Sequence, residues 1–492
     1  MRASARLRWE RGKHFLGVID ASFGEEKLED GRLDRFAVGG QAVGIATDMH
    51  VVTIAGSRAG KGRAAILPTL LTYPGSVVAI DPKGELASKS ALRRAAMGQK
   101  CHVLDPFEVA GEGAEALRCS YNPMESIHAD NPRIVEDAGL LADAIIQPVP
   151  GSTDPHWDES AKNFLEGIIL HVGTHSNYKD RRDLVMVNRV LASIKPEYSE
   201  LLQKEMEENL APKDAVIDAA AAFFGKPDRE RESVLSTLRR HTRFLGYESM
   251  QNVLGRASIS LANLKTAPTT VYLCLPAMRL GTCSRWLRMV INMTLAALEE
   301  DLTRPKLPVL LVLDEFAVLG HMKTIEDAAG QIAGLGCKLW PILQDLGQLK
   351  ALYRERWETF LGNAGIVQCF GNSDLTTLEW ISRRLGETTV RTETKAVLGY
   401  VQKFEKNEKG ISHAANVHPL LTPEEISRYF GRDDPFLRQL IIIAGYPPLI
   451  LQRAYYDRHE IFSKTERAVD RRLEASPRGF VGQKGENIRK RH

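Results

Sequence analysis

Residues 53–71 read TIAGSRAGKGRAAILPTLL, an apolar run that breaks into a glycine-rich loop and then becomes apolar again. The loop nearly matches the phosphate-binding pattern G-x-x-x-x-G-K-[ST]. Ala55 takes the place of the first glycine, and Gly62 takes the place of the hydroxyl residue that binds magnesium. Two interpretations of the loop alone stay open: a phosphate-binding site and a glycine turn without a ligand.

The sequence around this loop predicts an α/β fold with a mainly parallel sheet. Apolar, β-branched runs at residues 49–55, 75–81, 100–107 and 269–276 alternate with helix-length segments, and three more follow at 307–316, 338–345 and 364–371. Strands of this kind are buried on both faces by helices. The loop at 56–62 therefore joins a buried strand to a helix, which is the context that a phosphate-binding loop requires.

Between the third and fourth of these strands the sequence predicts helices only, with apolar residues at three- and four-residue spacing. We expect an all-α domain inserted into the α/β domain. Residues 387–416 are polar and charged and predict a protruding hairpin or loop. The predicted parts are an N-terminal extension with short strands (1–48), the first part of the α/β domain (49–123), the all-α domain (124–265), the second part of the α/β domain (266–462) and a basic tail (463–492).

Composition excludes several classes of protein. A net charge of +3 over 492 residues does not indicate a large basic surface, so a nucleic-acid site has to be local. The six cysteines form no C-x-x-C pair and predict free thiols in a reducing compartment. His171 and His175 have the spacing of a metal pair, but no third ligand is in view, and a plain helix face is favoured. No window reaches the roughly 18 apolar residues of a membrane-spanning helix.

Two other strands carry the chemistry that a phosphate loop needs. Lys61 in the loop is placed to reach the β- and γ-phosphates. LPVLLVLDEF, residues 307–316, ends an apolar strand in Asp314, a magnesium ligand, and Glu315, a base for the attacking water. CKLWPILQD, residues 337–345, ends in Gln344, an amide that can sense the γ-phosphate. The three strand ends together predict nucleotide hydrolysis with ATP and Mg²⁺ as cofactors.

At this point the sequence resembles the coupling ATPases of type IV secretion, the TraG-type proteins of conjugation. The similarity runs from about residue 40 to residue 460. It includes GSRAGKGRAAILPTLLTYPGSVVAIDPKGE, DPHWDESAKNFLEGIIL, LLVLDEFAVLG, LWPILQDLGQLKALY, FLGNAGIVQCFGNSDLTTLEWISRRLG and HPLLTPEEI. Many members share the GKG ending, so the resemblance favours a working site of a variant kind. Members usually carry N-terminal transmembrane helices, which this sequence lacks.

The resemblance implies a RecA-like P-loop NTPase domain with a small all-α domain, assembled as a homo-hexamer. It implies an ATPase that recruits relaxase-bound single-stranded DNA, without base specificity, or effector proteins to a membrane-embedded secretion channel. The expected location is cytoplasmic or peripheral at the inner membrane, with a separate membrane anchor as a further partner. The expected nucleotide-binding residues are Gly56, Ser57, Arg58, Ala59, Gly60, Lys61, Gly62 and Arg63.

Three alternatives stay open. Arg383 and Arg384 are candidates for an arginine supplied to the neighbouring subunit's site, or they form a solvated helix end. The tail at 463–492 carries nine Lys and Arg against four acids, and it is either a solvated segment or a nucleic-acid or partner contact. The competing functions are a nucleotide-binding platform for substrate docking with little turnover, and a soluble DNA-related ATPase of a mobile element.

Overall fold

The structure, a computed structural model, describes residues 5–147, 156–211, 214–255, 258–395 and 411–462. Its centre is a sheet of eleven strands in the order β4-β1-β15-β14-β11-β5-β10-β9-β6-β8-β7. The seven strands from β11 to β7 pair in parallel, which confirms the predicted α/β fold with a mainly parallel sheet. These are β11 (Ala364–Phe370), β5 (His50–Ala55), β10 (Cys337–Leu343), β9 (Val309–Leu313), β6 (Val77–Asp81), β8 (Thr269–Cys274) and β7 (Lys100–Leu104).

Four antiparallel strands complete the sheet on one side. They are β14 (Arg438–Ile443), β15 (Leu449–Gln452), β1 (His14–Ile19) and β4 (Gln41–Ile45). The first 48 residues therefore supply two strands to the same sheet, together with a separate hairpin of β2 (Ser22–Lys27) and β3 (Leu33–Val38). Strands from the first and the last described parts of the chain are neighbours here, because β1 pairs with β15.

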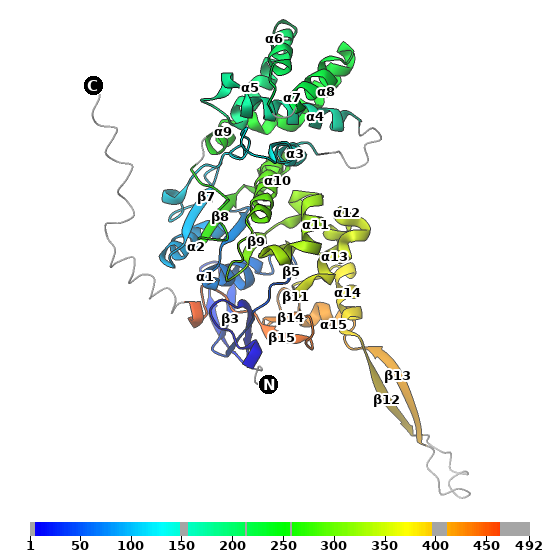
Figure 1. The fold of residues 1–492 in the computed structure, drawn as a ribbon. Coiled ribbons are helices and arrows are strands. Elements are labelled where there is room, and N and C mark those ends of the chain that lie inside the picture. Colours follow the sequence, from blue (N-terminus) through cyan, green and yellow to red (C-terminus); the bar gives the residue numbers. More distant parts are fainter. Residues whose placement is uncertain (1–4, 148–155, 212–213, 256–257, 396–410, 463–492) are drawn as a thin grey trace, which may run out of the picture.

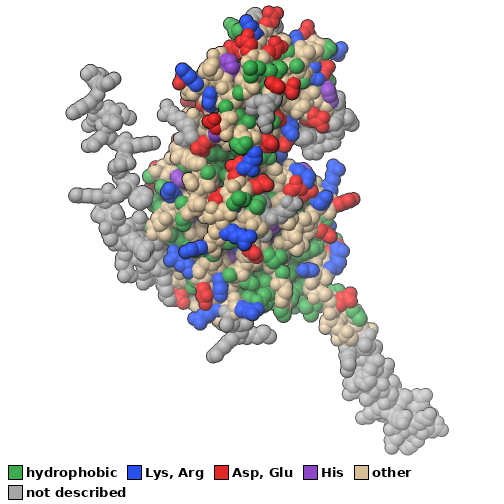
Figure 2. Space-filling model, viewed as in Figure 1, with side chains coloured by type: hydrophobic (Ala, Val, Ile, Leu, Met, Phe, Trp, Pro, Cys, Tyr) green, Lys and Arg blue, Asp and Glu red, His purple; other side chains and the backbone are tan. Residues whose placement is uncertain are grey.

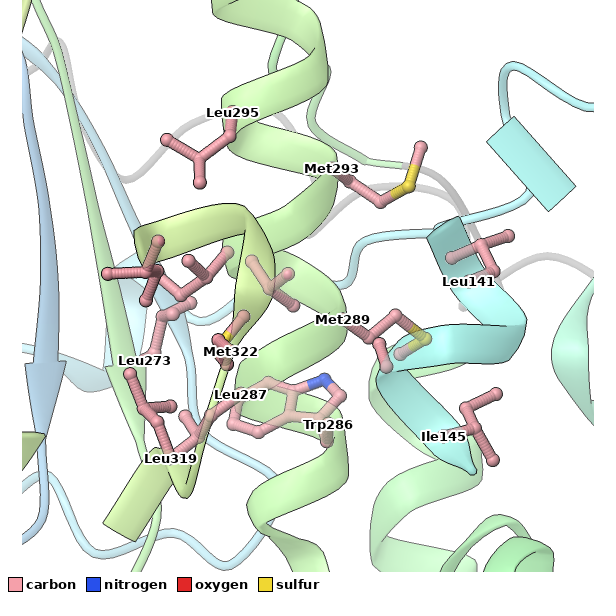
Figure 3. Close-up of a cluster of buried hydrophobic side chains, with 14 of the residues drawn as sticks. Leu141, Ile145, Leu273, Trp286, Leu287, Met289, Met293, Leu295, Leu319 and Met322 are labelled. Carbon is pink, nitrogen blue, oxygen red and sulfur yellow. The ribbon is translucent and has the colours of Figure 1, made fainter. Parts of the chain in front are cut away.

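The central strands are buried on both faces because their side chains alternate between two apolar cores. In β9, Val309, Leu311 and Leu313 belong to one core, whereas Leu310 and Val312 belong to the other. Helices α1 (Leu67–Thr72) and α2 (Glu85–Ala96) cover the second core. The first core is covered by the long helix α10 (Ala277–Glu300) with α3 (Ile134–Ile145), and Figure 3 shows Trp286 and Met289 of α10 packed between the two. Such two-sided burial is what continuous apolar strands require.

Seven helices lie between β7 and β8 in the chain, where the sequence predicts helices only. Figure 1 shows most of them stacked at one end of the molecule. They are α3, α4 (His156–Thr174), α5 (Leu184–Ser193), α6 (Pro196–Glu207), α7 (Ala215–Phe224), α8 (Asp228–Thr242) and α9 (Glu248–Leu254). Their apolar side chains are continuous with the first core of the sheet, so no solvent layer separates the helices from the sheet.

The second half of the chain adds helices beside the sheet and one projecting hairpin. Helices α11 (Lys323–Gln331), α12 (Leu346–Tyr353), α13 (Trp357–Gly362), α14 (Leu375–Leu385) and α15 (Pro423–Tyr429) lie along one side of it (Figure 1). Strands β12 (Glu387–Lys395) and β13 (Ile411–Pro419) form the hairpin predicted for residues 387–416, and it extends away from the body. The basic tail at 463–492 lies outside the described residues.

Several compositional expectations can be compared with the structure. All six cysteines are free, and five of them are buried. On the face drawn in Figure 2, Lys and Arg side chains are interspersed with Asp and Glu side chains. His171 is buried and hydrogen-bonds Asn209, and the described residues contain no group of three possible metal ligands. None of the described helices is long and apolar enough to cross a membrane.

Candidate functional site

The glycine-rich loop connects the carboxyl end of β5 to a helix that begins with a π-helical turn, Gly62–Ile66, and continues as α1. Gly60 has φ +86° and Arg58 has φ +58°, so the loop needs left-handed backbone at two places. Among the described residues, the backbone N–H groups of Gly60, Lys61, Gly62 and Arg63 donate to no protein acceptor. Unpaired N–H groups at the start of a helix form an anion site.

The loop is fixed in place by the segment that follows β11. A Cβ atom on Gly56 would lie 1.9 Å from the carbonyl oxygen of Gly371, so only glycine fits there. Ala59 is buried against Phe370, and its N–H donates to the Gly56 carbonyl at 3.1 Å. Ser57 and Arg58 are exposed at the tip of the loop. The glycine that matters for packing is therefore Gly56, one residue after the position that the phosphate-loop pattern specifies.

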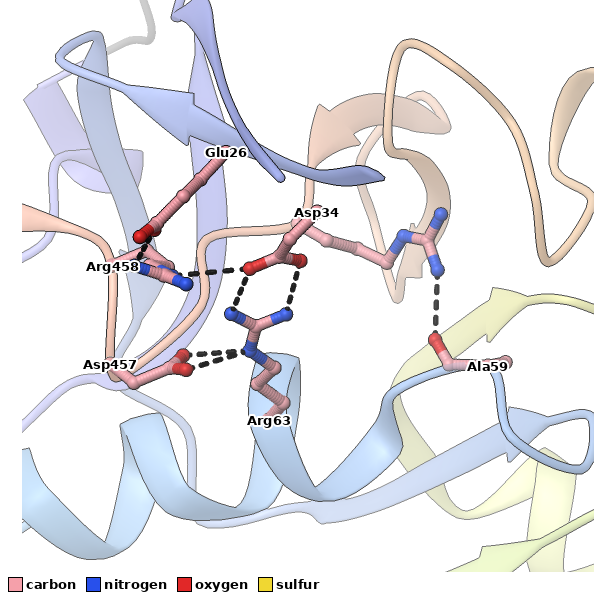
Figure 4. Close-up of polar contacts among 7 residues, drawn as sticks. Glu26, Asp34, Ala59, Arg63, Asp457 and Arg458 are labelled. Atoms are coloured by element: carbon pink, nitrogen blue, oxygen red, sulfur yellow. Dashed lines mark hydrogen bonds and ion pairs between the residues drawn. The ribbon is translucent and has the colours of Figure 1, made fainter. Parts of the chain in front are cut away.

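A buried arginine that the sequence analysis missed holds the same loop from the other side. Arg453, 1% exposed, donates from Nη1 to the carbonyl of Ala59 at 2.8 Å, as Figure 4 shows at Ala59. Its other donors reach the carbonyls of Leu437 and Arg432, both at 3.3 Å. No feature of the sequence marks Arg453, because its partners are backbone atoms of distant segments.

Lys61 lies beside both acids that follow β9. Its Nζ is 2.9 Å from Oδ1 of Asp314 and 2.7 Å from Oε1 of Glu315. Gln344, directly after β10, donates from Nε2 to Oε2 of Glu315 at 3.1 Å. The structure therefore brings together the four residues that the sequence analysis took from three separate strands. The reason is the strand order, because β5, β10 and β9 are neighbours and their carboxyl ends share one edge.

The charges of this group influence one another. Burial disfavours the ammonium of Lys61, but Asp314 and Glu315 outweigh it and raise the pKa of Lys61. Burial raises the pKa of Asp314 despite the attraction of Lys61. Glu315 differs: burial acts against its charge, yet the hydrogen bonds from Lys61 and Gln344 lower its pKa. Glu315 is therefore ionised at neutral pH, which a base for water requires.

Lys83 is a second cation that acts on the Glu315 carboxylate, and the sequence analysis did not include it among the site residues. Lys83 is exposed in the DPKGE loop after β6, and its charge contributes to the lowered pKa of Glu315. Gly84 in that loop has φ +67°, and a Cβ there would lie 2.5 Å from the carbonyl oxygen of Val109. The buried Asp81 accepts from the N–H of Ala87 at 2.8 Å and so ties the loop to α2. The sequence could have indicated Lys83, because the DPKGE stretch is part of the similarity to the coupling ATPases.

Arg63 differs from the expectation for a nucleotide-binding side chain. Its guanidinium makes two hydrogen bonds to Asp34 of β3, both at 2.7 Å, and its Nε donates to both carboxylate oxygens of Asp457 at 2.7 and 3.0 Å (Figure 4). Arg458 bonds the same Asp34 at 3.1 Å. The Arg63 side chain thus joins the first helical turn to both ends of the chain, and only its backbone N–H faces the anion site.

Arg383 and Arg384 lie at the C-terminal end of α14, and both are exposed. Arg383 lies 4.0 Å from Glu379. Among the described residues, neither arginine forms an ion pair with Asp314 or Glu315 of the same chain.

The donor set suits a magnesium ion in part. Asp314 offers a carboxylate beside the loop, and Mg²⁺ in phosphate sites takes one or two carboxylates with waters and phosphate oxygens. No hydroxyl stands at position 62. The residues therefore fit an ion held by Asp314, water and phosphate.

Comparison with known proteins agrees with this geometry. The family model described as "Type IV secretory system Conjugative DNA transfer" matches residues 18–477. The conjugal transfer protein TraG of Escherichia coli is 27% identical over 452 residues, which cover 84% of this chain and 68% of TraG. The coupling protein VirD4 of Bartonella henselae is 26% identical over 85% of this chain and 64% of VirD4. The chain thus spans about two thirds of the length of these relatives.

Solved structures show the same fold. The bacterial conjugative coupling protein TrwB, in a form described as TrwBdeltaN70, superimposes with a TM-score of 0.60 at 14% identity, covering 82% of this chain and 84% of that one. TrwB in complex with a non-hydrolysable ATP analogue gives a TM-score of 0.59 at 15% identity, with 82% and 85% covered. These similarities confirm the expected fold, an α/β domain with a mainly parallel sheet combined with an all-helical part.

Proposed function

Because this chain belongs to the type IV secretory system conjugative DNA transfer family, we propose that it is a coupling protein that hydrolyses ATP. It drives relaxase-bound single-stranded DNA, or protein substrates, to a transfer channel. The observation that carries the proposal is the cluster of Lys61, Asp314, Glu315 and Gln344 beside a loop with unpaired N–H groups. The solved TrwB complex with an ATP analogue supports the nucleotide class.

We infer that nucleotide phosphates compete with the two acids for Lys61. Phosphate oxygens accept from the N–H groups of residues 60–63, and the Lys61 ammonium turns from its carboxylates to the β- and γ-phosphates. Asp314, relieved of its ion pair, is then free to hold Mg²⁺. When bound, Mg²⁺ neutralises charge that develops on the phosphates.

Glu315 is the proposed base, and Gln344 positions it. Without nucleotide, Lys61 and Gln344 lower the pKa of Glu315 and keep its carboxylate ionised. When Lys61 turns to the phosphates, the pKa of Glu315 rises and the carboxylate becomes a stronger base for water. The hydrogen bond from Gln344 Nε2 leaves Oε1, which now contacts Lys61, available to a water once Lys61 moves. Loss of the γ-phosphate would return Lys61 to Glu315, so the group has two arrangements that depend on nucleotide.

We further propose that the chain assembles as a homo-hexameric ring in which each subunit supplies an arginine to its neighbour's site. Sites of this type complete the neutralisation of transition-state charge with an arginine from a neighbouring subunit. Arg383 and Arg384 are the candidates, since both are exposed and neither pairs with the acids of its own site. An equilibrium molecular mass with and without nucleotide tests the ring directly.

We further propose a cytoplasmic position at the inner membrane surface. Three exposed cations near the N-terminus (Arg6, Arg8 and Arg11) are available to anionic lipid at about 1 kcal/mol each, reduced by salt, whereas Lys13 donates to the Arg8 carbonyl at 2.8 Å. Membrane-embedded channel components and a separate anchor are the proposed partners there. Fractionation without these partners tests it: protein that still pellets with membranes after a high-salt wash contradicts peripheral binding.

The experiment for the proposed activity compares the Lys61→Ala variant with the wild type. We expect Lys61→Ala to abolish ATP hydrolysis, because the phosphates lose their counter-cation. Lys89→Ala, which removes an exposed lysine of α2, is the matched control and keeps wild-type turnover. Turnover of Lys61→Ala within twofold of the wild type would contradict the site assignment.

Adding single-stranded DNA to the same assay separates a motor from the two alternatives. A docking platform shows nucleotide binding with little turnover under both conditions, and a DNA-related ATPase of a mobile element is distinguished by having no secretion-channel or relaxase genes beside its gene.

A further inference from the structure

A pocket with unusual lining lies on the surface formed by α12, α13 and α14. Its volume is about 390 Å³, within the range of roughly 300–1,000 Å³ that ligand sites occupy. Six side chains line it: Lys350, Trp357, Glu358, Trp380, Arg383 and Arg384. Two of the six tryptophans of the chain therefore stand at one surface pocket together with three cations and a single acid.

The two indole rings are partly exposed rather than buried in the core. Trp357 and Trp380 pack against the edge of the first core, yet each keeps part of its surface open to solvent. The Nζ of Lys350 lies 4.6 Å from the centre of the Trp357 ring, a cation–π contact. Trp380, on α14, has no such cation above it among the described residues. One aromatic face is therefore occupied by a cation, and the other is available to a flat ligand.

The helices that line the pocket begin at the nucleotide site. Gln344, which contacts Glu315, directly precedes Asp345, the residue that caps α12 and leads to Lys350. Asn372 donates to the Gln344 carbonyl at 3.5 Å and stands just before α14, the helix of Trp380.

A further hydrogen bond fixes the two helices to each other, because the N–H of Leu346 donates to Oγ1 of Thr377 at 2.9 Å. A shift of Gln344 on loss of phosphate would therefore displace both α12 and α14.

We propose that this pocket binds single-stranded nucleic acid, with a base stacked on Trp380 and a flanking phosphate contacting Lys350. The inference rests on the proposed coupling function and names the residues that hold its substrate. Aromatic faces interleaved with cations are what sequence-tolerant single-strand sites use. A duplex keeps its bases stacked on one another, so only an unpaired base can reach the indole.

The test measures binding of a fluorescently labelled oligo-dT strand to the full chain by anisotropy, without nucleotide. Trp380→Leu is expected to weaken binding by about fivefold or more, since stacking contributes roughly 1–3 kcal/mol per base. Trp380→Phe keeps an aromatic face and is expected to retain binding within twofold. Lys350→Gln should weaken binding and lower the salt dependence by about 0.7 in log–log slope. Lys89→Gln, a charge change on α2, is the matched control.

Three results would overturn the proposal. The first is unchanged affinity in Trp380→Leu; the second is an equal loss in Trp380→Leu and Trp380→Phe, which would indicate packing. The third is tighter binding of an acidic peptide than of oligo-dT, which would make the pocket a protein contact. If Trp380→Leu unfolds, Lys350→Gln alone decides, because its side chain is partly exposed.

ATP hydrolysis without DNA is measured on the same samples. If the wild type hydrolyses ATP while the pocket variants bind DNA normally, the pocket proposal fails and the ATPase proposal stands. If the wild type binds oligo-dT through Trp380 but does not hydrolyse ATP, the ATPase proposal fails and the pocket stands.

Discussion

Arg453→Met is the most informative perturbation of the loop, because it removes one side chain that joins the loop to the C-terminal segment. Methionine keeps the length and apolar stem of Arg453 but has no donor. The carbonyls of Ala59 and Arg432 each lose the hydrogen bond from the Arg453 guanidinium, whereas the Leu437 carbonyl keeps its bond from the backbone N–H of residue 453 at 2.8 Å. A buried acceptor left without a partner costs about 1–3 kcal/mol.

The opposing effect is relief from burying a cation. Burial lowers the pKa of Arg453, which shows that its charge is disfavoured where it stands. Taking about 1–2 kcal/mol for each of the two carbonyls and allowing part to be offset, we expect the free energy of unfolding to fall by about 1–3 kcal/mol. Nucleotide affinity should fall as well, because the Ala59 carbonyl no longer fixes the loop.

The assays are denaturant unfolding and equilibrium binding of a non-hydrolysable ATP analogue. Arg432→Met is the matched control: its guanidinium is exposed and pairs with Asp433, so we expect the stability of this variant to match that of the wild type. The reasoning is refuted if Arg453→Met changes both stability and affinity no more than Arg432→Met does.

Three further predictions concern other parts of the chain. Gly56→Ala should lose nucleotide affinity and about 1–3 kcal/mol of stability, because its Cβ meets the Gly371 carbonyl, whereas Gly62→Ala has open space and should keep both; equal behaviour in unfolding and binding assays would contradict this. Burial raises the pKa of Asp81 to about 6, so its contribution to stability is present below about pH 4 and is lost as pH rises through 6. Compared with Asp81→Asn, the wild type should lose about 3 kcal/mol between pH 4 and 7, and parallel pH profiles of the unfolding midpoint would refute it. Deleting residues 463–492 should weaken binding of single-stranded DNA and reduce its salt slope, and an unchanged slope would assign the tail to solvent or to a protein partner.

The fold was largely accessible from the sequence because its strands are buried on both faces. Such strands appear in the sequence as continuous apolar runs, and the acidic or amide residues that follow each run can be identified there. Asp314, Glu315 and Gln344 could therefore be placed at one edge before their distances were known. The inserted helices were accessible for a similar reason, since their apolar residues repeat with helical spacing.

What could not be predicted depends on contacts between distant segments. The side chain of Arg453 binds the backbone carbonyl of Ala59, and the backbone carbonyl of Gly371 packs against Gly56. A contact with a backbone atom does not depend on the type of the partner residue, so the sequence does not indicate it. The ion pairs of Arg63 join it to Asp34 and Asp457, which only the pairing of β1 with β15 brings together. The sequence analysis could therefore place Arg63 only among the nucleotide-binding residues of the loop and not in these ion pairs.

The measurement that tests the central claim most directly is made on Glu315→Gln, with nucleotide binding and turnover recorded on the same sample. The amide keeps the size of Glu315 and can still accept from Lys61, but it cannot take a proton from water. The account predicts ATP-analogue affinity within about threefold of the wild type and turnover lower by at least about a hundredfold, in line with the usual contribution of a general base. Turnover within twofold of the wild type, or loss of nucleotide binding, would contradict the assignment of Glu315 as the base.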